Sequence, residues 1–196
     1  MEPKEEDIPE AILKKFRFCK LPKNHYRALR SDIQETGIDI SDWIEDPKSK
    51  LGVRGLFLYG DYGRGKSSIA AIVVKLLIHR GVFPLWIEYG DIPMYVKENT
   101  LFNANQTVLD RAKEVEFLVV NEFNPRKYSK AFPVDALDYL IRSRVGDGLT
   151  TIITSNTCPS KLVKDKDVGP MCESLVAISR EAFDSVLVSG KDLRKK

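Results

Sequence analysis

A glycine-rich loop between two apolar segments constrains this chain more than any other feature. Residues 60–67 read Gly-Asp-Tyr-Gly-Arg-Gly-Lys-Ser, which fits the phosphate-binding pattern G-x-x-x-x-G-K-[ST]. The apolar run 55–59 precedes the loop, and a long apolar segment follows it from Ser68 to Arg80. Strand, glycine loop and helix in this order form the context in which the pattern holds nucleotide phosphates. An incidental glycine turn would not require both flanks.

The residue types of the loop suit the chemistry of phosphate binding. Glycines allow consecutive backbone N–H groups to point inward, and the N-terminus of the following helix adds its positive dipole end. Lys66 would reach the β- and γ-phosphates of ATP, and the Ser67 hydroxyl would hold Mg²⁺. The predicted nucleotide-binding residues of the loop are Gly60, Asp61, Tyr62, Gly63, Arg64, Gly65, Lys66, Ser67 and Ser68.

Composition excludes several classes of protein. With 196 residues, 43% hydrophobic and 30% charged, the chain suits one globular domain with a short extension. Its net charge of +3 permits contact with nucleic acid without arguing for it. Three scattered cysteines and two histidines support neither a disulfide framework nor a zinc site. The charged N-terminus is unlike a signal peptide, and no apolar run is long enough for a bilayer, so we expect a cytoplasmic or nuclear protein with no membrane partner.

The chain divides into three expected parts. Residues 1–10 are acidic and contain proline, which predicts disorder. Residues 11–50 show helix-compatible periodicity and end in a polar, proline-containing break, which predicts a helical extension packed on the core. Residues 51–196 form the predicted nucleotide-binding core.

The core alternates apolar strands with helices. The expected helices cover 66–80, part of 91–111, and 133–145, and the expected strands cover 55–59, 83–89, 117–120, 150–154 and 186–188. Continuous apolar strands that alternate with helices indicate a mostly parallel sheet covered on both faces. The predicted fold class is therefore α/β, with a five-stranded sheet flanked by helices.

A second candidate element of the site is the apolar run 116–120, which ends in Asn121 and Glu122. The Glu122 carboxylate could orient a water for attack on the γ-phosphate. An aspartate is usual at position 121, where it binds Mg²⁺ through water, and an amide lacks the charge that a hard cation favours. The alternative interpretation is a buried strand that simply ends in surface polar residues.

A third candidate is the β-branched run 149–154, followed by Ser155 and Asn156. In open α/β folds, ligands bind at the carboxyl edge of the sheet, where these two residues should emerge. Asn156 could hydrogen-bond the attacking water or the γ-phosphate. Alternatively, Ser155 and Asn156 only turn the chain.

These three strand ends together resemble the Walker A, Walker B and sensor 1 motifs of AAA+ ATPases. More narrowly, GLFLYGDYGRGKSS, TIITSN and VLVSGKDLR resemble the DnaC/IstB group, over about residues 15–194. That group contains replicative helicase loaders and the ATPases that assist insertion-sequence transposases. The resemblance implies a P-loop NTPase core of the AAA+ type with a minimal C-terminal lid or none.

The resemblance also implies residue roles. Lys66 and Ser67 would bind phosphate and Mg²⁺, Glu122 would be the catalytic acid, and Asn156 the sensor. Arg194 falls where the group has a terminal arginine resembling sensor 2. Two departures stand out: Asn121 replaces the expected acid, as a weaker Mg²⁺ ligand, and residues 171–175 align poorly with the arginine-finger region. The remaining finger candidates are Arg180 and Arg144. Hydrolysis is accordingly expected to be slow or to depend on a partner.

Partners follow from the same resemblance. Relatives bind DNA as an assembled spiral, so DNA (single-stranded in a loader), a replicative helicase or transposase, and further copies of the chain are the expected partners. Basic residues are available for phosphate contact, and a tyrosine for base stacking. The candidate nucleic-acid residues are Arg126, Lys127, Tyr128 and Lys130, with Lys48, Lys50 and Arg54 before the core. A solvated charged loop is the alternative interpretation of these clusters.

Four functions compete at this stage. A replicative helicase loader that binds ATP and single-stranded DNA comes first, followed by a transposition helper ATPase. A regulatory nucleotide-binding module with weak hydrolysis is suggested by Asn121. A small-molecule kinase is disfavoured, because residues 154–156 fit a sensor strand and no arginine-rich lid follows.

Overall fold

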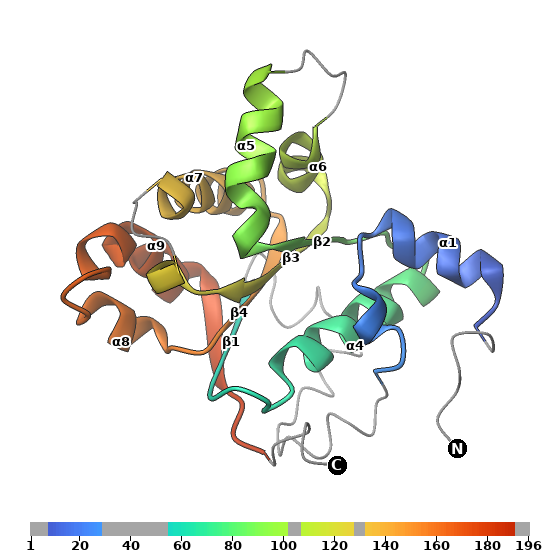
Figure 1. The fold of residues 1–196 in the computed structure, drawn as a ribbon, viewed down its shortest axis with the longest axis horizontal. Coiled ribbons are helices and arrows are strands. Elements are labelled where there is room, and N and C mark those ends of the chain that lie inside the picture. Colours follow the sequence, from blue (N-terminus) through green and yellow to red (C-terminus); the bar gives the residue numbers. More distant parts are fainter. Residues whose placement is uncertain (1–7, 29–54, 102–106, 128–131, 191–196) are drawn as a thin grey trace.

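The computed structural model describes residues 8–28, 55–101, 107–127 and 132–190. Its centre is a parallel five-stranded sheet with the strand order β2-β3-β4-β1-β5 (Figure 1). The strands are β1 (Gly55–Tyr59), β2 (Leu85–Glu88), β3 (Phe117–Phe123), β4 (Thr150–Ser155) and β5 (Phe183–Leu187). The predicted α/β class and parallel sheet are confirmed. Because all strands run the same way, their carboxyl ends meet at one edge of the sheet.

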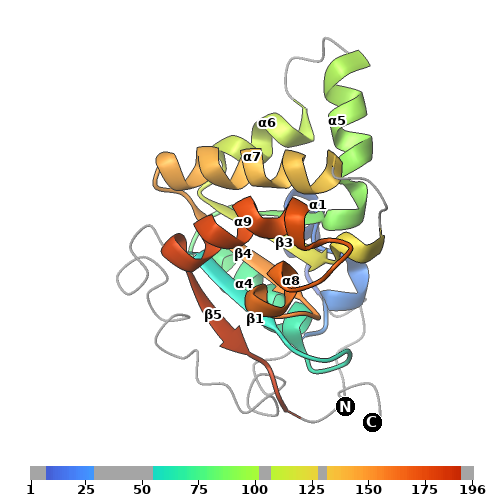
Figure 2. The same cartoon turned by 90° about the vertical axis from the view of Figure 1, so that its left-hand side faces the viewer.

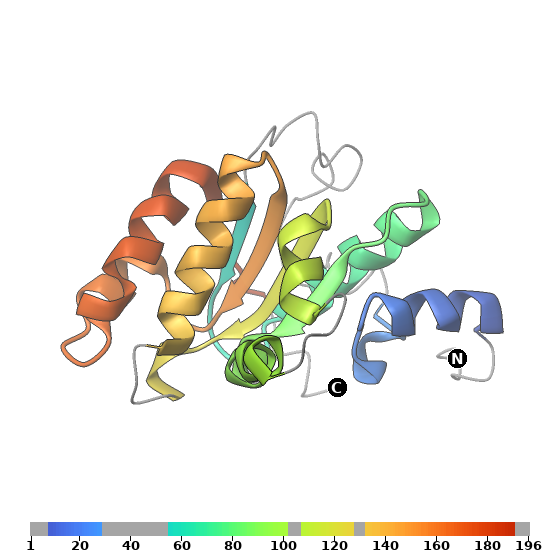
Figure 3. The same cartoon turned by 90° about the horizontal axis from the view of Figure 1, so that it is seen from above.

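Helices cover both faces of the sheet, so the molecule has three layers (Figures 1 and 2). One face carries α4 (Lys66–His79), and α1 (Glu10–Phe18) packs into the same apolar cluster. The other face carries α5 (Ile92–Leu101), α6 (Val108–Glu114), α7 (Phe132–Gly146), α8 (Pro159–Val163) and α9 (Gly169–Ala182). Figure 3 shows α7 and α9 running side by side above the strands.

Helix α4 begins at the end of the glycine loop and runs through the most apolar helical segment of the chain. Nine of its fourteen residues are buried, including Lys66. A helix that is apolar on nearly all sides must be enclosed, since its exposed surface would otherwise remain in contact with water. The helix ends before Gly81, whose φ of 80° is left-handed. The expected burial of this helix is confirmed.

The N-terminal segment packs on the core beside the edge strand β2. Leu13 and Phe16 of α1 are buried in the apolar cluster under α4. The Trp86 backbone N–H donates to the Cys19 carbonyl at 2.8 Å, so part of the open edge of β2 is satisfied by this segment. A short helix, η2 (Lys23–His25), then leads toward the carboxyl edge of the sheet. The predicted domain boundaries at 10 and 50 stay predictions, because residues 1–7 and 29–54 lie outside the described residues.

The main difference from expectation lies between β4 and β5. The sequence interpretation placed no helix there, yet α8 and α9 fill this stretch and β5 begins at Phe183 rather than at residue 186. The buried positions of α9 do recur at helical spacing: Gly169, Cys172, Leu175, Val176, Ser179 and Ala182. Four of these six are small or weakly apolar residues, so the helical period carries little hydrophobic contrast.

Within the described ranges, we find no helix that combines the length and apolarity needed to span a membrane.

Candidate functional site

The glycine loop adopts backbone conformations that other residues reach only under strain. Gly60 has φ 147°, and a Cβ added there would lie 2.3 Å from the Val188 carbonyl oxygen. Gly65 has φ 90° and is the N-cap of α4, so the loop turns directly into the helix N-terminus. A side chain at Gly60 would therefore push the loop away from β5. These glycines set the shape that a phosphate-binding loop needs.

The first two side chains of α4, Lys66 and Ser67, form hydrogen bonds beside the phosphate loop. The ammonium of Lys66 is 7% exposed and donates to the carbonyls of Gly60 at 2.8 Å and Asp61 at 2.7 Å. Its positive charge is thus held inside the loop, where phosphate oxygens require a counter-charge. The Ser67 hydroxyl donates to Asn121 Oδ1 at 2.8 Å, which leaves the oxygen lone pairs of Ser67 available to a cation.

A β-bulge changes the direction in which the side chains point at the end of β3. Val120 pairs with Ile153 and Phe123 with Ser155, so three steps along β3 match two steps along β4. The extra residue falls at Glu122, which has φ 56° and is exposed, while Asn121 and Phe123 on either side are buried. The Glu122 backbone N–H donates to Thr154 Oγ1 at 2.9 Å and fixes this turn. Left-handed backbone at a glutamate costs free energy and recurs at functional sites.

The end of β4 completes the arrangement. Ser155 is buried; its hydroxyl donates to the Phe123 carbonyl at 2.9 Å and accepts from the Thr157 backbone N–H at 3.1 Å. Ser155 therefore serves the chain turn, as the alternative interpretation held for this residue. Asn156 is half-buried.

A cavity of about 350 Å³ is lined by many of the predicted site residues, while Gly60, Asp61 and Arg64 line a neighbouring cavity. The lining of the first cavity combines the loop with the ends of β3 and β4 and with the N-terminal segment. The lining side chains and backbone belong to Asn24, His25, Tyr62, Gly63, Gly65, Lys66, Ser67, Ser68, Glu122, Thr154, Ser155 and Asn156. Lys66, Ser67, Glu122 and Asn156 come from three segments far apart in the sequence, and the parallel sheet places them around a single space.

Asn121 lies at the centre of a buried hydrogen-bond network. Its Oδ1 accepts from the hydroxyls of Ser67 and Thr154, both at 2.8 Å. Its Nδ2 donates to Glu88 Oε2 at 2.9 Å, and the other carboxylate oxygen of Glu88 accepts from Trp86 Nε1 at 2.7 Å. Burial raises the pKa of Glu88, and the hydrogen bonds from Trp86 and Asn121 oppose that rise. The amide of Asn121 satisfies this network because its oxygen accepts and its nitrogen donates. An ionised aspartate at position 121 has no N–H to donate to Glu88.

The chemistry of this group of residues fits Mg²⁺ bound together with phosphates. The described residues contain no cluster of three or more His, Cys, Asp or Glu side chains that could hold a metal by themselves. Mg²⁺ typically keeps several waters and takes one or two protein oxygens plus substrate phosphates. Ser67 Oγ supplies such an oxygen beside the loop, and the Asn121 Oδ1 that accepts from it is directly behind.

Arg194 and most of the candidate nucleic-acid residues fall outside the described part of the chain. Those candidates are Tyr128, Lys130, Lys48, Lys50 and Arg54. Gly190, the last described residue, contacts the loop, because Arg64 Nη1 donates to its carbonyl at 2.7 Å.

Arg126 and Lys127 belong to η4 (Pro125–Lys127), directly after β3. Arg126 is largely exposed and forms an ion pair with Asp165, donating to it from two nitrogens. The same hydrogen bonds hold the pKa of Asp165 below its ordinary value. The charge of Arg126 is therefore already paired within the chain.

Arg144 is not a surface arginine. It is completely buried, and it donates to the carbonyls of Ala112 at 2.6 Å, Val115 at 2.8 Å and Thr150 at 2.6 Å, and to Thr151 Oγ1 at 2.8 Å. Burial lowers the pKa of its guanidinium to about 10. The first two carbonyls belong to the C-terminal end of α6, where a helix leaves acceptors unsatisfied. This placement corrects the suggestion that Arg144 could reach a neighbouring subunit's nucleotide as an arginine finger.

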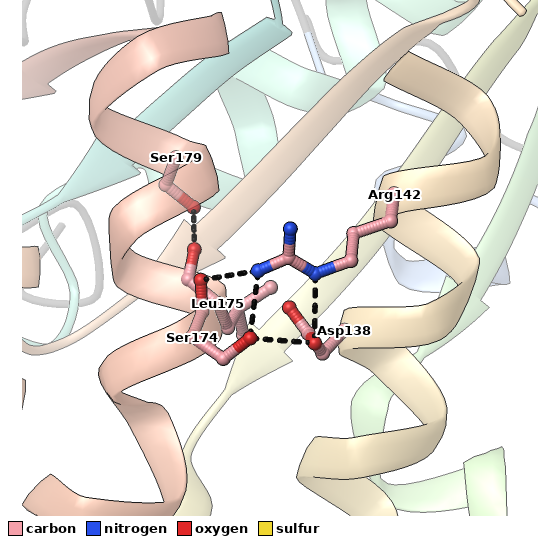
Figure 4. Close-up of polar contacts among 5 residues, drawn as sticks. All are labelled: Asp138, Arg142, Ser174, Leu175 and Ser179. Atoms are coloured by element: carbon pink, nitrogen blue, oxygen red, sulfur yellow. Dashed lines mark hydrogen bonds and ion pairs between the residues drawn. The ribbon is translucent and has the colours of Figure 1, made fainter. Parts of the chain in front are cut away.

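The region expected to hold an arginine finger packs α9 against α7. Arg142 donates to Asp138 at 3.1 Å and to the Ser174 hydroxyl at 2.7 Å, and that hydroxyl donates to Asp138 at 2.8 Å (Figure 4). Ser179 bonds within α9, to the Leu175 carbonyl, as the same figure shows. Ser174 thus takes part in an inter-helix contact. Arg180, near the end of α9, is exposed.

Sequence interpretation missed four residues of the site. Glu88 ends β2 at the same edge as Asn121 and is its partner in the strand register, so the rule that identified Asn121 would also have identified Glu88. Thr154 was assigned only to a strand. Asn24 and His25 carry no local signal, because their position depends on how the N-terminal segment folds back onto the core.

Solved structures of replication proteins share this fold. At probability 1.00, DnaI is similar at a TM-score of 0.63 and 18% identity, with 95% of this chain and 94% of that chain covered. This chain has the AAA+ ATPase fold. The DnaC helicase loader is similar at a TM-score of 0.70 and 16% identity, over 86% of this chain and 100% of that one. A replication initiator DnaA, bound to AMPPCP and single-stranded DNA, is similar at 0.61 and 17% identity, over 81% of this chain and 46% of the DnaA chain. No protein-family model and no curated protein sequence matches this chain.

Proposed function

We propose that this chain is an ATP-binding AAA+ ATPase that acts as a replicative helicase loader on single-stranded DNA. The single observation that carries the nucleotide part is the cavity at which Lys66, Ser67, Glu122 and Asn156 meet. The fold shared with the DnaC helicase loader and DnaI supports the loader part. A DnaA of the same fold was solved with AMPPCP and single-stranded DNA, which supports the choice of ligands.

In this proposal each residue of the site has a separate role in ATP binding and hydrolysis. Loop N–H groups and Lys66 bind the β- and γ-phosphates, and Ser67 would hold Mg²⁺, whose charge would offset that of the phosphates. Glu122 orients a water toward the γ-phosphate from its bulged position, and Asn156 hydrogen-bonds that water or a phosphate oxygen. Arg194 is proposed to contact the nucleotide from the C-terminal segment that begins at Gly190.

Hydrolysis and assembly form the finer part of the proposal. ATP and DNA would assemble copies of the chain, and an arginine from a neighbour would stabilise the transition state, a contribution of roughly a thousandfold or more in related enzymes. Arg180 is the exposed arginine of α9 proposed for this role. The loop after β3, with Arg126, Lys127, Tyr128 and Lys130, is proposed to follow the DNA strand. Because Arg126 is paired with Asp165, DNA phosphates would have to replace that partner.

Nucleotide binding is tested by comparing the wild type with Lys66→Ala in a fluorescent-ATP titration. The matched control is Lys166→Ala, which removes an exposed lysine that lines none of the cavities beside the phosphate loop. We expect Lys66→Ala to lose affinity by about 10–150-fold while Lys166→Ala keeps it, because a charge-assisted phosphate contact contributes about 1.5–3 kcal/mol. Equal affinity of Lys66→Ala and the wild type would refute the site. Unfolding midpoints of both variants establish that they are folded.

The client is tested with purified partners. Immobilised protein with ATP should retain a replicative helicase, and retention of a transposase instead would favour the transposition helper. ATPase turnover is then measured with and without single-stranded DNA, with Glu122→Gln as the inactive control. Turnover that stays at the level of Glu122→Gln under all conditions would favour a regulatory nucleotide-binding module.

A further inference from the structure

The position that would normally carry an acid behind the metal site is occupied by a neutral side chain. Asn121 is 3% exposed, and its Oδ1 accepts hydrogen bonds from both Ser67 and Thr154. The amide therefore orients the hydroxyl that would bind Mg²⁺ but adds no negative charge. A divalent cation bound at Ser67 needs that charge from another residue.

The neighbouring strand supplies a carboxylate at the required place. Glu88 is the register partner of Asn121 in the parallel β2–β3 pair, and its Oε2 accepts from Asn121 Nδ2 at 2.9 Å. Its Oε1 accepts from Trp86 Nε1 at 2.7 Å, so both carboxylate oxygens are oriented by donors. Since each oxygen of a carboxylate has a second lone pair, both can still accept from water.

The space in front of Glu88 is suited to a hydrated cation. A cavity of about 370 Å³ adjoins the phosphate-loop cavity and shares Glu122 and Asn156 with it. Its lining includes three carboxylates and four side-chain amides, and no lysine or arginine. These residues are Glu88, Asp91, Glu122, Asn24, Asn121, Asn124 and Asn156. His25 is the one group of its lining that could carry a positive charge, and burial lowers its pKa.

Glu88 does not form a metal site by direct ligation. No group of three or more acidic, histidine or cysteine side chains within the described residues could hold a metal. Mg²⁺ keeps much of its water shell in nucleotide sites, so a carboxylate one layer away acts on the waters and on the ligand that it orients. The hydrogen-bonded path from Glu88 through Asn121 to Ser67 is of this kind.

We propose that Glu88, at the end of β2, is the positioning residue that supplies negative charge to the Mg²⁺ site, because the neutral side chain of Asn121 supplies none. The acid and amide have in effect exchanged strands: the carboxylate ends β2 and the amide ends β3. Glu88 acts through Asn121 and through metal-bound water, and Ser67 remains the direct ligand. The inference rests on the proposed nucleotide function and names the residue that makes its Mg²⁺ binding strong.

The test measures how much Mg²⁺ tightens nucleotide binding, without relying on turnover. A fluorescent ATP analogue is titrated with Mg²⁺ and with EDTA against the wild type and Glu88→Gln. We expect Glu88→Gln to lose about 10–100-fold of the Mg²⁺-dependent tightening while its affinity in EDTA stays the same, since loss of an outer-shell partner costs metal affinity by that factor. Asp91→Asn is the matched control, because it removes one charge from the same cavity but leaves the hydrogen bond between Glu88 and Asn121 in place, and it should lose clearly less of the tightening than Glu88→Gln.

A charge exchange provides the second arm. Asn121→Asp alone would set two carboxylates against each other where one hydrogen bond now joins them, and should not strengthen Mg²⁺ binding. The double variant Glu88→Gln/Asn121→Asp restores one carboxylate and one amide, and should recover the tightening even if Glu88→Gln by itself does not fold. Full tightening in folded Glu88→Gln, equal loss in Asp91→Asn, or no recovery in the double variant would overturn the proposal.

The same titration separates the two proposals. A wild type that binds no ATP in either buffer refutes the nucleotide function itself. If the wild type binds ATP, and Mg²⁺ increases the ATP affinity of the wild type and of Glu88→Gln by the same factor, only the role of Glu88 is refuted.

Discussion

Replacing the buried guanidinium of Arg144 should destabilise the fold without touching the nucleotide cavity. Arg144→Met keeps much of the side-chain volume but removes four hydrogen bonds of 2.6–2.8 Å, to three carbonyls and one hydroxyl. Each buried acceptor left without a donor costs at least about 1 kcal/mol. Four of them give about 4 kcal/mol.

Thermal unfolding checks this value directly. For a chain of this size, about 1 kcal/mol corresponds to 2–4 °C in the unfolding midpoint, so Arg144→Met should unfold roughly 8–16 °C below the wild type. Arg142→Met is the matched control two residues away, since its side chain is 47% exposed and its pair with Asp138 contributes about 1 kcal/mol or less. If both variants unfold within about 3 °C of the wild type, the structural role of Arg144 is refuted. A stable Arg144→Met with lost ATPase activity would instead restore it as an arginine finger.

Two further predictions concern titratable groups. Burial lowers the pKa of His25 below 6.5, so the neutral imidazole stabilises the fold above that pH, and this stability is lost as the pH falls through the lower folded-state pKa. Chemical denaturation between about pH 7 and 5 should therefore show a steeper loss of stability in the wild type than in His25→Gln, and parallel curves would contradict the burial of this ring. Among the cysteines, burial raises the pKa of Cys19 to about 12 and that of Cys172 to about 11. Partial burial opposes ionisation at Cys158, but hydrogen bonds, that with the Ser160 side chain foremost, lower its pKa overall. Mass spectrometry after brief iodoacetamide treatment should find Cys158 modified first in the native protein, and faster labelling of Cys19 or Cys172 would refute this order.

Local patterns predicted much of the core, and the reasons can be stated for particular segments. The loop 60–67 was predictable because its glycines encode backbone conformations, at Gly60 and Gly65, that depend little on distant contacts. The α4 helix was predictable because its apolar residues outnumber the others on every side. Helix α9 was not predicted because four of its six buried positions are Gly, Cys, Ser and Ala. These residues bury well when a neighbour such as α7 covers them, but they give little hydrophobic signal in the sequence.

In the candidate site, too, some features were predictable from the sequence and others depend on contacts in space. Asn121 was recognised as a departure from an acid, but the chain alone offered no reason for it. The reason is a spatial one: its amide joins two hydroxyl donors on one side to the Glu88 carboxylate on the other. The bulge that exposes Glu122 while burying its neighbours is likewise a property of how β3 and β4 pair, with no signature in the residues themselves.

By itself, the sequence determined the phosphate loop, the succession of core strands and helices as far as β4, and the polar residues that end β3 and β4. These depend on local backbone preference and on hydrophobic periodicity, which operate over a few residues. Only the tertiary structure decided that Glu88 stands beside Asn121, that Asn24 and His25 line the nucleotide cavity, and that Arg144 is interior. Each of these is a contact between segments far apart in the chain. Such contacts arise when parallel strands align their carboxyl ends and helices close over the sheet.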